Sequence, residues 1–270
     1  MWKVCFVLLM SLPMQLQGVS AMDSVTVTVV FDNTALVNNV TPEWGFAAVL
    51  EFPNETLLFD TGNDGDILMK NLKALGFGKT SFSKIVISHM HWDHTGGLET
   101  VLKRNPDATV FLPASATAEE VEAIKPLCQE IVRVSDPQAV NEVLMSLGEL
   151  PGRANEQSLG IACDSGIVLV TGCAHPGIVE IVEQAHEVLP NQPVLWCVGG
   201  FHLHRHSKKQ VMTIIKSLKK LEVRQVSPTH CTGEEAIEWF AKEYGEHYIR
   251  GGVGARQKFQ LAAPRENSEP

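Results

Sequence analysis

The sequence predicts an α/β fold, in which short β-branched strands alternate with amphipathic helices. Two observations carry this prediction. Apolar stretches with strand and helix spacing follow one another along most of the chain. Polar residues, several of them histidines, come directly after five of the strands, where α/β proteins place their sites. With 270 residues, 44% of them hydrophobic, the chain is long enough for one large core.

The first half of the chain predicts strands and helices in alternation. Its strands are alternating or β-branched, and Pro53-Asn54 marks a hairpin. Its helices have apolar spacing that stops at Gly76 or at Pro126. The strands are expected at residues 25–31, 46–52, 56–59, 85–88 and 109–112. The helices are expected at residues 67–75, 98–103 and 118–125.

The second half repeats this scheme more loosely. Asp164-Ser165-Gly166 predicts a tight turn, so that the strands on either side of it form a hairpin. The strands are expected at residues 158–163, 167–171, 194–198, 224–227 and 253–261. The helices are expected at residues 177–189, 208–221 and 234–243.

The two ends of the chain are expected to lie outside this domain. Lys3, an apolar run over residues 4–12 and the small residues Val19-Ser20-Ala21 are typical of a signal peptide over residues 1–21. The run is too short to span a bilayer; the alternatives are a hydrophobic first strand or an anchored helix. We therefore expect an exported protein, periplasmic or secreted, with one domain over residues 22–263 and a disordered tail over residues 264–270.

The net charge of the chain limits the classes of molecule that it is expected to bind. A formal net charge of -9 argues against broad attraction to nucleic acid or to anionic lipid surfaces. We expect a small-molecule substrate, no nucleic acid and no stable membrane anchor after removal of the signal peptide. Nothing in the sequence indicates the oligomeric state.

The run His89-Met90-His91-Trp92-Asp93-His94 predicts a metal site. It follows a buried-looking strand, and it concentrates three of the 10 histidines of the chain beside a carboxylate, which a solvated turn does not need. Imidazole and carboxylate ligands in this pairing suit two adjacent divalent cations, zinc first, with manganese or iron as alternatives.

Four further strand ends carry polar tips that we expect on the same edge. They are Asp60-Thr61-Gly62, Cys173-Ala174-His175, Gly199-Gly200-Phe201-His202 and Thr229-His230-Cys231. Of the six cysteines, Cys5 lies in the signal peptide, and the five that remain cannot all pair within one chain. Cys173 and Cys231 each stand near a histidine, which favours a thiol at the metal site over a disulfide scaffold.

These motifs resemble the metallo-β-lactamase superfamily, whose His-x-His-x-Asp-His signature matches residues 89–94 and whose Asp-Thr-Gly matches residues 60–62. Residues 171–178, 199–203 and 228–233 are similar to the branch that contains the 7,8-dihydropterin-6-methyl-4-(β-D-ribofuranosyl)aminobenzene 5′-phosphate synthases. The resemblance covers the mature chain and implies a four-layer αβ/βα sandwich, with two mixed sheets inside and helices outside.

The resemblance also implies roles for individual residues. His89, His91 and His175 would hold one ion, and Asp93, His94 and His230 would hold the other, with a water between the two ions. Asp93, Asp60 and His202 are the candidate catalytic residues, Asp93 as ligand or base and Asp60 either as a support for a histidine or as a cap of its turn. By the resemblance, His202 and Arg153 are candidate substrate-binding residues, although Arg153 could also be a plain surface arginine. Thr232 is a third candidate on other grounds: it leads into the helix expected from residue 234, whose free N–H groups could receive an anion, or it could simply cap that helix.

The chain departs from the commoner superfamily pattern at two positions. The strand at residues 109–112 offers no histidine, so that His175 has to take over. Cys173 stands where a bridging aspartate is usual; it is either a thiolate ligand or a buried packing residue. Where the branch has an amide, this chain has Glu180, so that its substrate recognition is expected to differ.

The function that follows is metal-dependent hydrolysis of a small ester, phosphoester or related substrate by a metal-activated water. One alternative is a dihydropterin-type synthase of the same fold. The other is a non-catalytic, exported metal-binding module. A structural zinc site would be closed and cysteine-rich, whereas this one is rich in histidine, which favours an enzyme.

Overall fold

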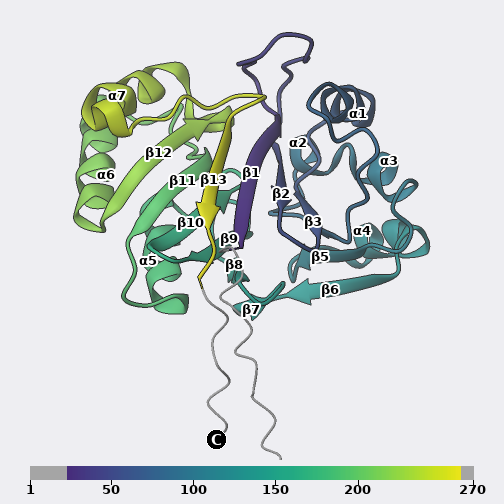
Figure 1. The fold of residues 1–270 in the computed structure, drawn as a ribbon. Coiled ribbons are helices and arrows are strands. Elements are labelled where there is room, and N and C mark those ends of the chain that lie inside the picture. The colour runs from purple at the N-terminus through teal and green to yellow at the C-terminus, as the bar shows by residue number, and fades with distance from the viewer. Residues whose placement is uncertain (1–22, 263–270) are drawn as a thin grey trace, which may run out of the picture.

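Two β-sheets pack face to face in the computed structural model, which describes residues 23–262, and helices cover the outer face of each sheet (Figure 1). The predicted signal peptide, residues 1–21, and the predicted tail, residues 264–270, lie outside the described residues. The layered arrangement confirms the predicted αβ/βα sandwich.

The first sheet has seven strands in the order β13-β1-β2-β3-β4-β5-β6. It begins with antiparallel pairs and continues with the parallel strands β3 to β6. The bounds are β1 Ser24–Phe31, β2 Ala47–Glu51, β3 Thr56–Phe59, β4 Lys84–Val86, β5 Thr109–Pro113, β6 Glu130–Val134 and β13 Arg256–Gln260.

The second sheet has six strands in the order β12-β11-β10-β9-β8-β7. Strands β10, β11 and β12 run parallel, and β9 and β10 form the predicted hairpin. The bounds are β7 Gln138–Ala139, β8 Leu144–Leu150, β9 Glu156–Cys163, β10 Gly166–Thr171, β11 Val194–Gly200 and β12 Val223–Thr229.

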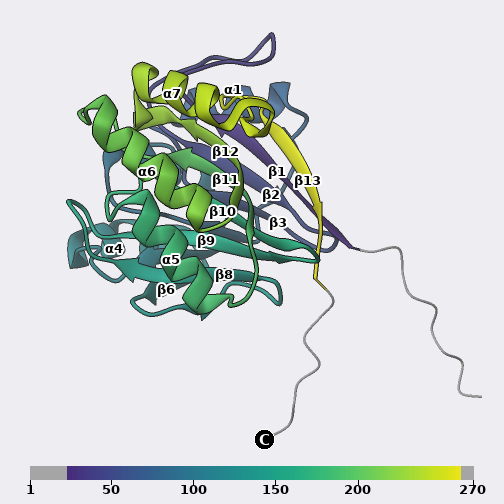
Figure 2. The same ribbon diagram turned by 90° about the vertical axis from the view of Figure 1, so that its left-hand side faces the viewer.

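Helices α1, α3 and α4 lie against the first sheet, and α5, α6 and α7 lie against the second (Figures 1 and 2). Several begin at side-chain caps that fix their first turns. Asp64 accepts a hydrogen bond from the Ile67 N–H, and Thr117 and Ser207 form capping boxes with Glu120 and Gln210. The bounds are α1 Gly65–Ala74, α2 Trp92–Thr95, α3 Leu98–Leu102, α4 Ala118–Ile124, α5 Ile178–Val188, α6 Lys208–Lys220 and α7 Glu234–Tyr244.

The main apolar core lies between the two sheets. Phe46 and Phe59 from the first sheet side and Trp196 from the second belong to one fully buried cluster. The Trp196 Nε1–H donates to Ser227 Oγ at 2.8 Å, so that its polar atom is satisfied inside the core. Burial of this cluster from both sides fixes how the two sheets are placed against each other.

The structure adds elements that the sequence pattern did not predict. β6 is an edge strand with exposed Glu130 and Arg133, and β8 carries an irregularity in its register around Gly148, whose φ is +81°. Neither has the clean apolar alternation of an expected strand. A single helical turn, α2, lies inside the histidine motif. β13 also begins at Arg256 rather than at residue 253.

The sheets bring their functional strand ends to one edge. The carboxyl ends of the parallel strands β3 and β4 in one sheet, and of β10, β11 and β12 in the other, lead into the polar loops predicted as site residues. Within residues 23–262, none of the helices has the length and apolar character that crossing a bilayer requires.

Candidate metal centre

The loops after these five strands converge on a cluster of metal-ligating side chains. Four groups have ligand atoms that all lie within 4.8 Å of one another. They are His89/His91/His175, Asp93/His94/His230, His89/His94/Cys173 and Cys173/His202/Cys231. Two of them are the two ligand sets that the resemblance implies.

The first set consists of three imidazoles from two sheets. His91 Nδ1 lies 3.0 Å from His89 Nε2 and 3.2 Å from His175 Nε2. Ser88 Oγ lies 2.9 Å from His89 Nδ1, so that the other ring nitrogen of His89 faces the cluster. His89 is buried, whereas His91 is exposed, and the set therefore opens to solvent on one side.

The second set combines a carboxylate with two imidazoles. Asp93 Oδ2 lies 3.3 Å from His230 Nε2 and 3.9 Å from His94 Nε2. Asp60 Oδ2 lies 2.7 Å from His94 Nδ1, and Asn33 Oδ1 lies 3.1 Å from His230 Nδ1. Each histidine is thus held from behind while its Nε2 atom points to the centre, as in metal sites whose ligands are oriented by outer partners.

Cys173 lies between the two sets. Its Sγ atom is 3.2 Å from His94 Nε2, and it shares a ligand group with His89 as well. Cys231 lies behind it, with Sγ 3.6 Å from the Cys173 carbonyl oxygen. The described cysteines are all free thiols. Cys173 therefore lies close to one histidine of each set, His89 and His94.

A buried glutamate fixes the loop that carries Cys173 and His175. Glu156 on β9 accepts hydrogen bonds from the backbone N–H groups of Gly172, Cys173, Ala174 and His175, at 2.9 to 3.0 Å. Burial raises the pKa of its carboxyl, although these four bonds favour the ionised form. A second buried carboxyl, Asp32, accepts from Thr34 N–H and Thr229 Oγ1 beside His230, and burial raises its pKa to about 7.

The backbone is strained at the same loops. Four residues that are not glycine have left-handed φ values: Asp60 at 56°, Ala174 at 58°, His202 at 51° and His230 at 50°. Such conformations cost about 1 kcal/mol or more each and concentrate at functional sites. Their clustering here indicates that the loops are shaped for the centre rather than for packing alone.

The electrostatics suit metal ligation. Burial lowers the pKa of His175 to about 3 and that of His230 to about 4, and burial with the charge of His94 holds the pKa of His89 well below its usual range. These imidazoles are therefore neutral at neutral pH, as metal ligands must be. Burial alone would raise the pKa of Asp93, but the close approach of the His230 ring and the charges of His94 and His230 hold it below its usual range.

The donor set fits divalent cations. Nε2 of His230, which lies 3.3 Å from Asp93 Oδ2 on the side of the centre, is buried and makes no hydrogen bond within the described residues. Unsatisfied buried nitrogen atoms are costly unless something binds them. Five imidazoles, one carboxylate and one thiol supply the nitrogen, oxygen and sulfur ligands that zinc takes, with manganese and iron as alternatives.

Of the other residues predicted for catalysis or substrate binding, two line the open cavity and two are buried. His202 lies with its ring centroid 4.3 Å from that of His175, and Arg153 lines the same cavity. Asp60 is fully buried behind His94 and does not face the open side, so that it positions a ligand rather than contacting a substrate. Thr232 does not have its predicted place in substrate binding. It is fully buried, and its hydroxyl accepts from Phe201 N–H and donates to the Thr229 carbonyl.

Sequence reasoning missed several residues of the site. Trp44 donates from Nε1 to Asp93 Oδ2 at 2.8 Å, and its ring lies 4.8 Å from that of His230. Asn33 and Glu156 were likewise not predicted. In the sequence, the one signal for Glu156 was its place in the polar run Glu-Gln-Ser at the start of an apolar strand. The structure shows that all three of these polar side chains are buried.

Comparison with known proteins agrees with this geometry. The family model of the metallo-β-lactamase superfamily matches residues 41–124, which include Asp60 and the histidine motif. The 7,8-dihydropterin-6-methyl-4-(β-D-ribofuranosyl)-aminobenzene-5′-phosphate synthase of Methanocaldococcus jannaschii is 28% identical over 90% of this chain and 100% of its own length. An uncharacterized protein of the same organism is 26% identical, over 84% of this chain and 98% of its own.

Solved structures show the same fold. A metal-dependent hydrolase of the β-lactamase superfamily superposes with a TM-score of 0.72 at 25% identity, covering 86% of this chain and 98% of its own. A diphosphatase from the PhnP family superposes with a TM-score of 0.60 at 14% identity, covering 89% of this chain and 99% of its own. Together with the family match over residues 41–124 and the ligand sets, these similarities show the metallo-β-lactamase fold, and the chain is similar to members of that superfamily.

Proposed function

We propose that this protein is a metal-dependent hydrolase that acts on a small ester, phosphoester or related substrate. The observation that carries the proposal is a centre of imidazole, carboxylate and thiol ligands that is open to solvent at the exposed His91. Three of its histidines are held at their Nδ1 atoms by neighbouring polar side chains. A structural zinc site would be closed by four protein ligands, whereas a catalytic site keeps a position free.

The proposed ligands follow the two observed sets. His89, His91 and His175 would hold one divalent cation, and Asp93, His94 and His230 would hold a second, with Cys173 between them. When bound, such cations polarise a carbonyl or phosphoryl group and lower the pKa of water, so that hydroxide is available near neutral pH.

The chain itself would supply proton handling and orientation. Asp93 is proposed as a ligand and as the acceptor of a proton from the attacking water, and Trp44 holds its Oδ2 atom in place from one side. His202 and Arg153 lie next to His175 on the open side and would contact the substrate. Asp60 would act through His94 by fixing the orientation of its ring.

Metal analysis combined with a substrate panel tests this function. The protein as purified is analysed for metal and then assayed on carboxylic esters, lactones, phosphomonoesters and phosphodiesters with the metal that is found. We expect turnover that falls at least about a hundredfold in His91→Ala and is unchanged in His247→Ala, an exposed histidine outside the ligand groups. Full metal occupancy without turnover on the panel would favour the non-catalytic metal-binding module.

A synthase is the second candidate, and it is favoured by one observation. The relative that is 28% identical across nearly the whole chain is named as a synthase of a dihydropterin joined to a ribofuranosyl-aminobenzene phosphate. Formation of that product, detected by mass spectrometry with the metal-loaded protein, would replace hydrolysis as the proposed reaction.

Export remains a proposal that rests on the signal-peptide pattern of residues 1–21. We propose a periplasmic or secreted protein with a small-molecule substrate and no nucleic-acid partner. N-terminal sequencing of the protein from cell fractions tests it: a mature chain that begins near Met22 outside the cytosol is expected. Recovery from the cytosol with Met1 intact would refute it.

A further inference from the structure

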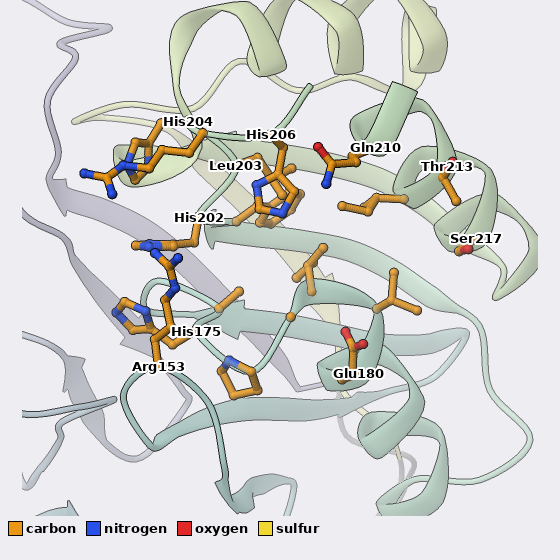
Figure 3. A pocket seen from close by; sticks show the side chains of 18 residues that line it. Arg153, His175, Glu180, His202, Leu203, His204, His206, Gln210, Thr213 and Ser217 are labelled. Carbon is orange, nitrogen blue, oxygen red and sulfur yellow. The ribbon is translucent and has the colours of Figure 1, made fainter. Parts of the chain in front are cut away.

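A groove opens beside His175 and runs between α5 and α6 (Figure 3). Its volume of about 670 Å³ lies in the range of small-molecule sites. Arg153 and His202 gather with His175 at one end, and Glu180 on α5 and Gln210 and Thr213 on α6 line the rest. We call this cavity the α5–α6 groove. Apart from those three residues at its end, its lining has no part in the proposed hydrolysis.

The end of the groove next to the metal centre is cationic. Arg153 gives this end its positive charge (Figure 3), and the lining as a whole holds Arg153 and Arg205 against Glu180, whereas the chain has 22 Lys and Arg against 31 Asp and Glu. Local positive charge in an acidic protein raises the concentration of anions at that point. His202 adds a buried Nδ1 atom that has no hydrogen-bond partner within residues 23–262.

The remainder of the groove has a different character. Val179, Leu203 and Ile214 give it apolar walls, on which an alkyl or ring part of a ligand could lie. Polar groups along these walls come from Gln210, Thr213 and Ser217 of α6 (Figure 3). A ligand in the groove would thus be extended, with its charged end at Arg153.

Glu180 is the one acidic residue in this lining, and the backbone makes room for its carboxylate. Gly177 has a φ of +115°, and a Cβ atom built there would lie 2.1 Å from Glu180 Oε2. Any larger residue at position 177 would therefore push the carboxylate away from the start of α5. Glu180 forms no ion pair with any residue in the described part of the chain, which leaves it available to a hydrogen-bond donor.

We infer that the α5–α6 groove binds the non-reacting part of an elongated organic phosphate. The phosphate would lie between Arg153, His202 and the metal centre, and the chain would run between α5 and α6 and present an ammonium or hydroxyl group to Glu180. A guanidinium suits phosphate because it donates two parallel hydrogen bonds. This inference rests on the proposed function for the reaction, but binding in the groove can be measured without it.

Calorimetric binding of phosphonates, which are not hydrolysed, tests the groove in the metal-loaded protein. The probes are ω-aminoalkylphosphonates of three to six carbons, alkylphosphonates of the same lengths, and methylphosphonate. We expect affinity to rise with chain length and the amine to add about a further tenfold, as a charge-assisted bond to Glu180 would. In Glu180→Gln the gain from the amine should be lost and the gain from length kept.

Blocking the groove gives the matched comparison. Ile214→Trp should remove the dependence on chain length and leave methylphosphonate binding within about twofold, while Lys216→Trp, on an exposed position of the same helix outside the lining, should change neither. If Ile214→Trp does not fold, the Glu180→Gln comparison decides. The inference would be overturned if affinity did not depend on the length of the alkyl chain, or if the terminal amine still increased affinity in Glu180→Gln.

Turnover separates this inference from the proposed function. The substrates are 4-nitrophenyl phosphodiesters that carry the same alkyl or aminoalkyl groups as the phosphonates, and the release of nitrophenol is followed. Phosphonate binding in the groove without turnover of any ester would refute the hydrolase and leave the groove standing. Turnover whose KM is the same for short and amine-bearing chains would refute the groove and leave the hydrolase standing.

Discussion

The Oδ2 atom of Asp60 lies 2.7 Å from Nδ1 of His94, and both side chains are fully buried. The same carboxylate accepts hydrogen bonds from the N–H and the hydroxyl of Ser88, each at 2.7 Å, so that it cannot rotate freely. Burial would lower the pKa of His94, but the charge of Asp60 and its bond to the ring raise it. The pair therefore fixes both the orientation of the ring and the nitrogen that faces the centre.

Replacement of this carboxylate should weaken metal binding more than folding. In Asp60→Asn the side chain keeps its shape but loses its charge, and outer partners of this kind are worth about ten- to a hundredfold in metal affinity. Competition with a chelator measures the change, and Asp66→Asn, on the exposed first turn of α1, is the control. Metal affinity equal to that of the parent would leave Asp60 with the role of a turn cap.

The Glu156 carboxylate should matter for stability, because it holds four consecutive backbone N–H groups. A glutamine has one acceptor oxygen and would place an NH₂ group against an N–H donor. We expect Glu156→Gln to lower the free energy of unfolding by about 2 to 3 kcal/mol. Urea unfolding of the metal-free protein measures it, with Glu187→Gln on the outer helix α5 as control. A loss below about 0.5 kcal/mol would show that the loop does not depend on this carboxylate.

Both residues illustrate what could be predicted from the sequence. The histidine motif and the tips of five strands predicted the two ligand sets, because strand ends in parallel sheets meet at one edge. Asp60 was found because it stands at such a strand end. Glu156 was missed because it begins a strand rather than ending one, and its partners lie 16 to 19 residues further along the chain.

The fold was predictable where the local signals agreed with the tertiary structure. The hairpin of β9 and β10, with its Asp-Ser-Gly turn, appears as expected. Strands β6 and β8 were missed, since an edge strand keeps polar residues and a bulge breaks the alternation. Thr232 was predicted to bind substrate because Thr-Gly precedes a helix. In the structure its hydroxyl is instead hydrogen-bonded to the backbone N–H of Phe201 and the carbonyl of Thr229.

The two thiols at the centre should behave differently towards a bound metal. Cys173 Sγ faces His94 Nε2 at 3.2 Å, whereas Cys231 Sγ points to a backbone carbonyl. With cobalt as a spectroscopic substitute, we expect a thiolate-to-metal absorption band that is lost in Cys173→Ser and kept in Cys231→Ser. Cys128→Ser, away from the ligand groups, is the control. A band that persists in Cys173→Ser would identify this residue as a packing thiol, and loss of the band in Cys231→Ser would make Cys231 a ligand.

An ion pair far from the centre gives a pH-dependent contribution to stability. Glu55 Oε2 accepts from Lys84 Nζ at 2.5 Å and from Ser83 Oγ at 3.0 Å, and its Oε1 accepts from Asn141 Nδ2 at 2.8 Å. Partial burial would raise the pKa of Glu55, but these bonds outweigh it and lower the pKa below its ordinary value of 4.5. Because the folded pKa is the lower one, the stabilisation is complete above the unfolded value and is lost as the pH falls through the folded value.

We therefore expect Glu55→Gln to lower the free energy of unfolding by about 1 kcal/mol at pH 7, a value reduced for the exposure of the pair. The difference from the parent protein should shrink as the pH is lowered below 4.5, since the parent carboxylate then becomes protonated as well. Urea unfolding between neutral and acidic pH measures both. Glu122→Gln, in an exposed pair with Lys125, should show no such trend. A difference that stays constant with pH would assign the effect of Glu55 to packing and not to its charge.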